Sequence, residues 1–289
     1  MSAFSCIPRG LCHGVVDYTT PKNVSTMLKQ KVQNHQKLNL DYNQDYVNGI
    51  TKKDYGALFN YVSSIKPETI LDLCGGSGSL AVKLTEMGYD VYLLDHAGQL
   101  IEKAIQKGLA REKAITADIL KLKNESLGEN FDLVVMKSSS HEFPKDKRKL
   151  VDATAFRLIK KGGYFIDWDA YFPTEDLSVW ATKWINLKDE IAGLSDLVKN
   201  RSLVIESEAI ANLKDVGFHD IRVVYRGLYT LSVKKFAEVD WDFDKKKTEE
   251  FYKKTIQLLQ SAPNDLAYST TGVDVEVKFP IIYLSAKKN

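Results

Sequence analysis

Short apolar runs that end in glycine or in an acid alternate with amphipathic helical patterns between residues 67 and 170. This alternation is typical of βαβ units and of a mostly parallel sheet covered on both faces by helices. We therefore predict a doubly wound α/β fold. The predicted strands of this region are Ile70–Leu73, Asp90–Leu94, Ala114–Thr116, Phe131–Met136 and Tyr164–Trp168.

The last third of the chain has longer helical patterns and fewer strands. Pro280 lies inside the final predicted strand, which favours an edge position or a bulge over a central strand. Trp180 and Trp184 are one helical turn apart, a spacing more typical of a core than of a substrate box. The predicted elements are helices Leu177–Val198, Ser207–Val216 and Lys246–Leu259 and strands Ile221–Tyr225 and Val275–Leu284.

Length and charge limit the function classes. The 289 residues are enough for one large domain with a smaller cap, and 40 basic against 38 acidic residues leave a net charge of +2. So small a charge gives no general attraction to a polyphosphate, so a nucleic-acid partner is not expected. Residues 1–66 are polar and rich in tyrosine, with a helix predicted from Asn23 to Gln36.

The cysteines and the apolar runs indicate the compartment. Cys6, Cys12 and Cys74 are odd in number and form no CxxC pair, so we predict neither a disulfide framework nor a metal site. The N-terminal sequence lacks the apolar core of a secretory signal, and no apolar run approaches the ~20 residues that cross a bilayer. We expect a soluble cytoplasmic protein with no membrane partner.

A glycine loop follows the first predicted strand, in the sequence Asp72-Leu-Cys-Gly-Gly-Ser-Gly78. Gly75, Gly76 and Gly78 let backbone N–H groups approach a ligand closely, and a helix that opens at about Ser79 adds its positive end. A simple tight turn is the alternative, because glycine turns are common.

Acids follow the next two strands. Asp95, with His96 beside it, ends the second strand 95 − 72 = 23 residues after Asp72, where nucleotide-binding sheets hold ribose hydroxyls. Asp118 and Ile119 follow the third strand, where a carboxylate can accept from an adenine amine and an aliphatic side chain can cover its ring. Each acid alone could be a solvated strand end, but three at successive strands favour a nucleotide site.

These residues resemble the class I S-adenosylmethionine-dependent methyltransferases, well over residues 65–170 and loosely over the C-terminal strands. In that family the loop reads roughly D-x-G-x-G-x-G, and here Cys74 replaces the usual first glycine. The resemblance implies a seven-stranded sheet, an N-terminal helical lid over residues 1–66 and a cofactor domain over residues 67–289. It also implies S-adenosylmethionine as cofactor, with Lys137 and Ser138 near its methionine half. The implied cofactor-binding residues are Asp72, Gly75, Gly76, Gly78, Asp95, His96, Asp118, Ile119, Lys137 and Ser138.

Other cofactor chemistries compete with this interpretation. Gly76-Ser-Gly-Ser-Leu-Ala81 also fits the dinucleotide pattern G-x-G-x-x-G/A, although Asp72 lies where dinucleotide folds usually keep an apolar residue. A non-methylating use of S-adenosylmethionine, such as azetidine ring closure with release of methylthioadenosine, stays open because Lys137 replaces a more usual neutral residue. A non-catalytic binding module is the lesser alternative.

Methyl transfer needs alignment of the acceptor with the C–S bond, and a base only where the acceptor loses a proton. His141 follows the fourth strand and is the candidate base, with a structural histidine as the alternative. Asp167 and Asp169 should point one way along the fifth strand and Trp168 the other. Asp169 is predicted to hold an amine acceptor, or else to bond loop amides, and Tyr18 to close over the sulfonium.

The acceptor is predicted to be a small molecule. Nucleobase amino-methyltransferases of this superfamily carry an Asn/Asp-Pro-Pro-aromatic run after the fourth strand, where this chain has Lys137-Ser-Ser-Ser140. Two insertions, at about residues 172–206 and 228–272, are predicted to form a cap that closes the pocket. The identity of the acceptor, the atom methylated and the oligomeric state stay open.

Overall fold

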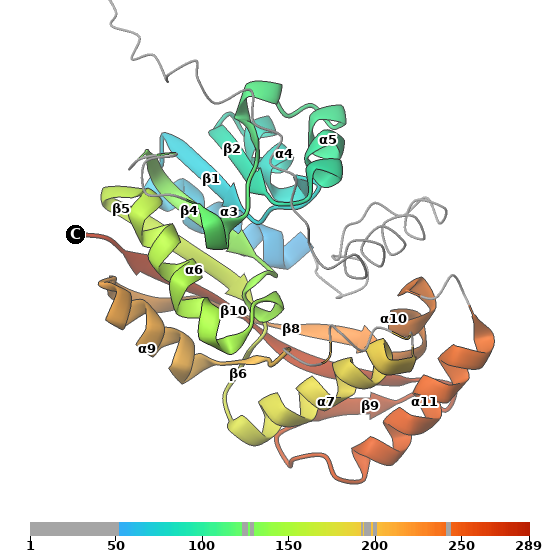
Figure 1. The fold of residues 1–289 in the computed structure, drawn as a ribbon. Helices are drawn as coiled ribbons and strands as arrows, with labels where there is room; N and C mark the ends of the chain where they lie inside the picture. Colours follow the sequence, from blue (N-terminus) through green and yellow to red (C-terminus); the bar gives the residue numbers. More distant parts are fainter. Residues whose placement is uncertain are drawn as a thin grey trace, which may run out of the picture.

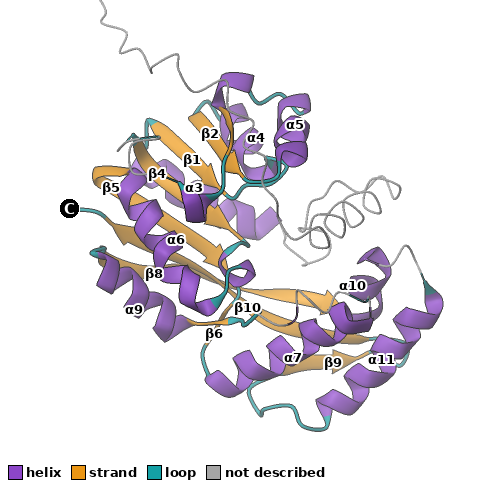
Figure 2. Cartoon of the chain, viewed as in Figure 1, coloured by secondary structure: helices purple, strands orange, loops and turns teal. Residues whose placement is uncertain are grey.

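The computed structural model describes residues 52–122, 127, 130–191, 193, 198, 201–240 and 244–289. Helices and strands alternate along them as the apolar pattern predicts (Figures 1 and 2). The helices are α3 (Lys52–Ile65), α4 (Ser79–Glu86), α5 (Gly98–Gln106), α6 (Lys145–Leu158), α7 (Glu175–Ile191), α9 (Glu206–Val216), α10 (Val233–Asp240) and α11 (Lys245–Leu259), with short 3-10 turns η1 (Arg111–Lys113), η2 (Ile119–Lys121) and η3 (Ser140–Glu142).

The strands form one large sheet and one small one. The strands of the large sheet are β1 (Thr69–Leu73), β2 (Asp90–Asp95), β3 (Ala114–Thr116), β4 (Phe131–Lys137), β5 (Ile159–Asp169), β8 (His219–Ser232), β9 (Ala267–Thr270) and β10 (Val275–Lys287). The small sheet pairs β6 (Tyr171–Phe172) with β7 (Val204–Ile205) in parallel.

The strand order is β3-β2-β1-β4-β5-β10-β8, in which β1 to β5 run parallel and β10 runs antiparallel to both of its neighbours. The glycine loop lies where the strand order changes direction, between β1 and β4. This arrangement confirms a doubly wound, mostly parallel fold. The predicted count of seven strands is one short, because β9 adds an eighth strand that pairs with the first residues of β10.

Helices cover both faces of the sheet. Buried residues of α3, α4 and α5 pack on one face and buried residues of α6 and α9 on the other, in two separate hydrophobic clusters. The strands serve both clusters because successive side chains alternate: Trp168 lies with the α3 cluster, while Phe165 lies with the α6 cluster. Asp167 and Asp169 face the α6 side, as predicted, where they contact the turn η3.

β10 lies between β5 and β8, so the predicted edge position is wrong for the strand as a whole, although Pro280 itself pairs on one side only. Residues 275–278 of β10 pair with β9, and residues 282–287 pair with β5. Between these two stretches, Pro280 pairs with Leu228 of β8 alone. A residue without an N–H group is tolerated there because one side of the strand has no ladder partner at that point.

The two predicted insertions pack on each other beside the main sheet, with α7 next to α11 over the far ends of β9 and β10 (Figure 1). Trp184 of α7 is fully buried, stacks on Phe236 of α10 at 5.1 Å and contacts Phe251 of α11. Its Nε1 donates to Thr255 Oγ1 at 3.0 Å. Trp184 is therefore a core residue of this cap, as predicted, and β8 extends into the cap well beyond its predicted end at Tyr225.

Candidate active site

The glycine loop joins β1 to α4 through left-handed backbone at three positions, Cys74 (φ 58°), Gly76 (φ 55°) and Gly78 (φ 72°). At Gly75 the constraint is space, since a Cβ would lie 2.4 Å from Asp72 Cγ and from Leu93 Cδ1. Cys74 adopts the conformation that the missing family glycine would favour, so the substitution changes the side chain and keeps the path of the loop.

Asp72 ends β1 beneath this loop and is fully buried. One carboxylate oxygen, Oδ2, accepts from Ala81 N at 3.0 Å, and Oδ1 has no partner in the described part of the chain. Burial raises the pKa of Asp72 to about 7, although Lys137 and the Ala81 N–H oppose the shift. An unpartnered buried oxygen beside Gly75, where a side chain has no room, is suited to a cationic or hydrogen-donating ligand.

Asp95 is held at the end of β2 by backbone on two sides. Its Oδ2 accepts from Gly76 N at 2.9 Å and its Oδ1 from Ala97 N at 2.8 Å. His96 lies 3.4 Å from Oδ1 with its side chain 61% exposed. The carboxylate is thus fixed against the glycine loop, and each oxygen keeps a second lone pair that a ribose diol can use.

Asp118 starts the turn η2, where its Oδ1 accepts from Leu120 N at 3.0 Å and its Oδ2 lies 3.2 Å from Lys121. Ile119 is only 4% exposed and packs in the α6 cluster. The three strand-end acids therefore lie along one edge of the sheet, as predicted. Contacts of Asp118 and Ile119 with an adenine stay a prediction.

Lys137 and Ser138 end β4 beside the aromatic residues of α3 and β5. The Lys137 ammonium lies 5.3 Å from the ring centre of Trp168 and 5.7 Å from that of Tyr55. Ser138 adopts a left-handed backbone (φ 53°), and its Oγ lies 3.3 Å from Tyr229 Oη. The end of β4 thus brings a cation and two hydroxyl groups to the same edge as the glycine loop.

His141 is clamped by the end of β5. Its Nδ1 lies 2.7 Å from Asp169 Oδ1, and its backbone N–H donates to Asp169 Oδ2 at 3.1 Å. The other ring nitrogen, Nε2, lies 3.2 Å from Glu142 Oε1. Burial disfavours the charged imidazole, but Asp169 and Glu142 outweigh it and raise the pKa of His141 to about 10. The imidazole is therefore protonated at neutral pH, and both N–H groups are donors.

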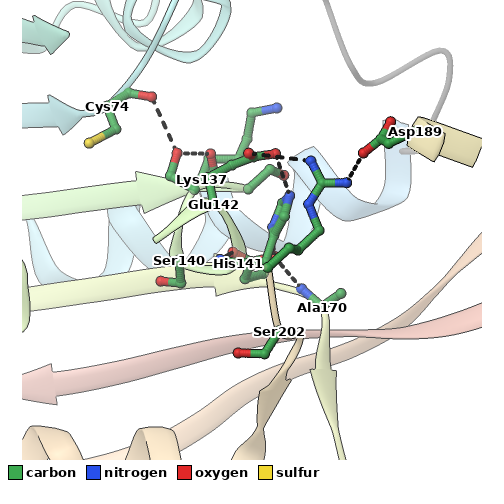
Figure 3. Close-up of polar contacts among 12 residues, drawn as sticks. Cys74, Lys137, Ser140, His141, Glu142, Ala170, Asp189 and Ser202 are labelled. Atoms are coloured by element: carbon green, nitrogen blue, oxygen red, sulfur yellow. Dashed lines mark hydrogen bonds and ion pairs between the residues drawn. The ribbon is translucent and has the colours of Figure 1, made fainter. Parts of the chain in front are cut away.

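The charged contacts continue from His141 into the cap (Figure 3). Arg201 lies 3.8 Å from Glu142 and forms an ion pair with Asp189 at the end of α7. Sequence analysis missed Glu142, Arg201 and Asp189, because these residues lie on separate elements and nothing in the local sequence brings them together. Tyr18, the remaining predicted catalytic residue, lies outside the described residues.

A second set of contacts lies under the same turn. Asp167 Oδ2 accepts from Ser140 Oγ at 2.6 Å and from the Tyr171 hydroxyl group, while Arg148 Nε donates to Ser140 O at 3.2 Å. Both strand-end acids of β5 thus hold η3, Asp167 through Ser140 and Asp169 through His141. Sequence analysis placed Asp167 on this strand, but nothing in it pointed to Arg148 or to this contact of Ser140.

The described helices include none that is long and apolar enough to cross a membrane. Among the same residues, no three His, Cys, Asp or Glu side chains are grouped so that they could ligate a metal ion.

Residues 70–163 match the family model described as "Methyltransferase domain". No curated protein sequence matches the chain. Among solved structures, the YcgJ protein of Bacillus subtilis superposes with a TM-score of 0.63 at 14% identity, over 81% of this chain and 99% of that one. A candidate methyltransferase of Bacillus halodurans C-125 gives 0.60 at 18% identity, over 76% of this chain and 92% of that one.

A methyltransferase from Haemonchus contortus, phosphoethanolamine N-methyltransferase 2, has a TM-score of 0.52 at 14% identity. The match covers 85% of this chain and 56% of that one, whose structure holds phosphomonomethylethanolamine and S-adenosylhomocysteine. These likenesses show a shared fold, that of the class I S-adenosylmethionine-dependent methyltransferases.

Proposed function

We propose that this chain, whose residues 70–163 match the methyltransferase domain and whose fold is that of the class I S-adenosylmethionine-dependent methyltransferases, methylates a small-molecule acceptor. The observation that carries the proposal is the row of Asp72, Asp95 and Asp118 at successive strand ends. Two of the three contact the glycine loop or the helix after it, Asp72 through Ala81 and Asp95 through Gly76.

The cofactor is S-adenosylmethionine, and the residues present fit it. Asp95 would accept from the ribose hydroxyls and Asp118 from the adenine amine. Asp72 Oδ1, which is buried without a partner, lies at the loop that would face the methionine half, with Lys137 close by. When bound, the cofactor supplies an electrophilic methyl group on a sulfonium.

On the acceptor side, Asp169 orients His141 and keeps it protonated. A protonated imidazole cannot serve as a base, so we assign His141 the role of a cationic donor that orients the acceptor. The acceptor's lone pair must then already be available, or its proton must leave to another group. Tyr18, on the segment proposed as a lid, would exclude water from the sulfonium.

A small acceptor is supported by the net charge of +2 and by the cap, whose contact with the site runs through Arg201 and Glu142. The Haemonchus protein, which is named for the methylation of a small phosphorylated amine, shows that this fold accommodates such acceptors. A small molecule with a nucleophilic nitrogen, oxygen or sulfur is the proposed substrate class.

The test measures the affinity of S-adenosylmethionine by calorimetry for the wild type and for Asp95→Ala. Loss of the ribose acceptor should weaken binding at least about tenfold. Glu102→Gln, which removes an exposed acid of α5 that pairs with Arg111, is the matched control and should bind as the wild type does. Equal affinities for Asp95→Ala and the wild type would refute the ribose assignment.

Product analysis identifies the reaction. Incubation with S-adenosylmethionine and a cell extract should yield S-adenosylhomocysteine and an acceptor heavier by one methyl group. Methylthioadenosine as product would instead show intramolecular ring closure, and a cofactor that binds but is never consumed would show a binding module.

A further inference from the structure

A small cavity lies next to the turn η3 (Ser140–Glu142), on the side of the sheet covered by α6 and α9. Its polar lining consists of Ser140, Arg148, Asp152, Asp167, Tyr171 and Asn212, and its remaining walls are Phe143 and apolar residues of α6, β7 and α9. The cavity volume of about 10 Å³ is comparable to a single water-sized probe sphere. A polar cavity of this size holds one water molecule when hydrogen-bond partners surround it.

Asp167 lines this cavity and carries one unpartnered oxygen. The residue is 3% exposed, and its Oδ2 accepts two hydrogen bonds, from Ser140 and from Tyr171. Its Oδ1 has no partner among the described residues. Because Oδ2 already accepts two hydrogen bonds, a proton on this carboxyl group belongs on Oδ1, where it can donate to a water molecule.

Asp152 of α6 lines the same cavity. It is 7% exposed, and Arg148 lies one helical turn before it. Burial raises the pKa of Asp152 to about 7 and raises that of Asp167 well above its usual value. Two buried carboxyl groups, one of them with an unpartnered oxygen, thus line one space that fits one water molecule.

The groups that face Asp167 come from every element around it. Asp169 lies on the same strand, Asp152 and Arg148 on α6, Tyr171 on β6 and Cys74 after β1. The charges of Asp169 and Asp152 disfavour ionisation of Asp167, and the Arg148 guanidinium favours it. Ser140 and Tyr171 favour ionisation through their hydrogen bonds, but burial and the two carboxylates outweigh them. The surroundings therefore favour a neutral acid at this position.

Arg148 extends the contacts of the cavity to the cap. Its Nε donates to Ser140 O, and its Nη2 donates to the carbonyl oxygen and the hydroxyl group of Ser202. Ser202 follows Arg201, which pairs with Glu142. The turn that carries His141 is thus held on one side by the cavity residue Arg148 and on the other by Arg201 of the cap.

We propose that Asp167, as a neutral carboxylic acid, and Asp152 share one proton through a single water molecule in this cavity, and that this pair holds the turn Ser140–Glu142 in the position that clamps His141 to Asp169. Asp167 and Asp152 are then positioning residues. The functional importance of the pair rests on the proposed role of His141, but the proton-sharing itself does not.

The experiment uses NMR titration of the His141 ring, assigned by its loss in His141→Gln, in the wild type, Asp167→Asn and Asp167→Ala. An asparagine copies a neutral carboxylic acid: its Oδ1 accepts from Ser140 and Tyr171, and its Nδ2 is a donor in place of the protonated Oδ1. Asp167→Asn should therefore keep the His141 midpoint within about half a unit of the wild type. Asp167→Ala should lower it by about one unit or more as the turn loosens.

Infrared spectroscopy gives a readout that needs neither acceptor nor cofactor. The wild type near neutral pH should show the C=O band of a protonated carboxyl group that is missing from Asp167→Asn and retained in Asp146→Asn. Asp146 is an exposed acid on α6 outside the cavity and is the matched control. Asp152→Ala should lower the His141 midpoint, and Asp146→Ala should not.

Two results would overturn the proposal. If Asp167→Asn lowers the His141 midpoint as far as Asp167→Ala, the carboxyl group acts as an anion. If no protonated-carboxyl band is lost in Asp167→Asn, Asp167 is ionised and no proton is shared. Should Asp167→Ala fail to fold, the asparagine variant and the infrared band still decide the question, and both are independent of whether the protein methylates anything.

Discussion

The two halves of the sheet edge are built in different ways. Along β1, β2 and β3, each acid is held by a backbone N–H: Asp72 by Ala81, Asp95 by Gly76 and Ala97, and Asp118 by Leu120. Along β4 and β5, His141 and Ser140 are held by side chains that lie 27 or 28 residues away, and the contacts continue into the cap.

The two halves of the site should therefore respond differently to changes elsewhere in the protein. A site held by backbone amides of its own loop depends on the path of the chain and tolerates change in distant regions. A site held by buried side chains from several elements depends on how those elements pack. We therefore expect changes in the cap to act on the turn at β4 and leave the glycine loop intact.

The largest expected effect comes from Trp184→Ala in the cap. Removing a fully buried indole should lower the free energy of unfolding by about 3–5 kcal/mol, because a cavity replaces its contacts with Phe236 and Phe251. Trp184→Phe, which loses the hydrogen bond to Thr255, should cost only about 1 kcal/mol. Denaturant unfolding measures both free energies. If Trp184→Ala also weakened cofactor binding as strongly as a change in the glycine loop does, the two halves of the sheet edge would not be independent.

The next effect is the pH dependence of stability that His141 contributes. A histidine whose pKa is raised on folding stabilises the folded state fully below its unfolded pKa, near 6.5, and loses that contribution as pH rises through about 10. Relative to His141→Gln, the wild type should lose about 2–4 kcal/mol across this window. Parallel pH profiles of thermal unfolding for the two proteins would show that Asp169 and Glu142 do not hold a cation.

Gly75→Ala tests the glycine loop directly. Its new Cβ would lie 2.4 Å from Asp72 Cγ, so we expect a loss of about 1–3 kcal/mol in stability and a large loss of cofactor affinity. Gly56→Ala is the matched control, because a Cβ there meets no atom within 4 Å and alanine favours the helix α3. Normal cofactor binding by Gly75→Ala would show that the loop can rearrange.

The smallest expected effect is that of Cys74→Gly, which restores the glycine of the family pattern. Glycine relieves the strain of the left-handed backbone at this position, and the loss of the buried thiol side chain opposes that gain in stability. We expect a net change within about 1 kcal/mol and unchanged cofactor affinity. Cys74→Ala keeps the strain and loses the thiol, so it should be the less stable of the two, which thermal unfolding can check.

Much of the fold could be predicted because periodicity is local. The strand Ala114–Thr116 is found at its predicted bounds, and β1, β2 and β4 differ from theirs by a residue at one end. The apolar residues of α5 also recur at helical spacing, and Leu100, Ile101 and Ala104 are buried. β9 and the extension of β8 were missed. Both belong to the cap, and the cap depends on the packing of α7, α10 and α11, which local periodicity does not reveal.

By itself, the sequence determined the doubly wound sheet, the glycine loop and the three strand-end acids, since each follows from residues that are close in the chain. Only the tertiary structure decided that Asp169 clamps His141 as a cation, that Arg201 connects the turn to the cap, and that Asp152 and Asp167 meet in one cavity. These contacts join elements that are far apart in sequence, and their strength comes from burial, which exists only once the chain has folded.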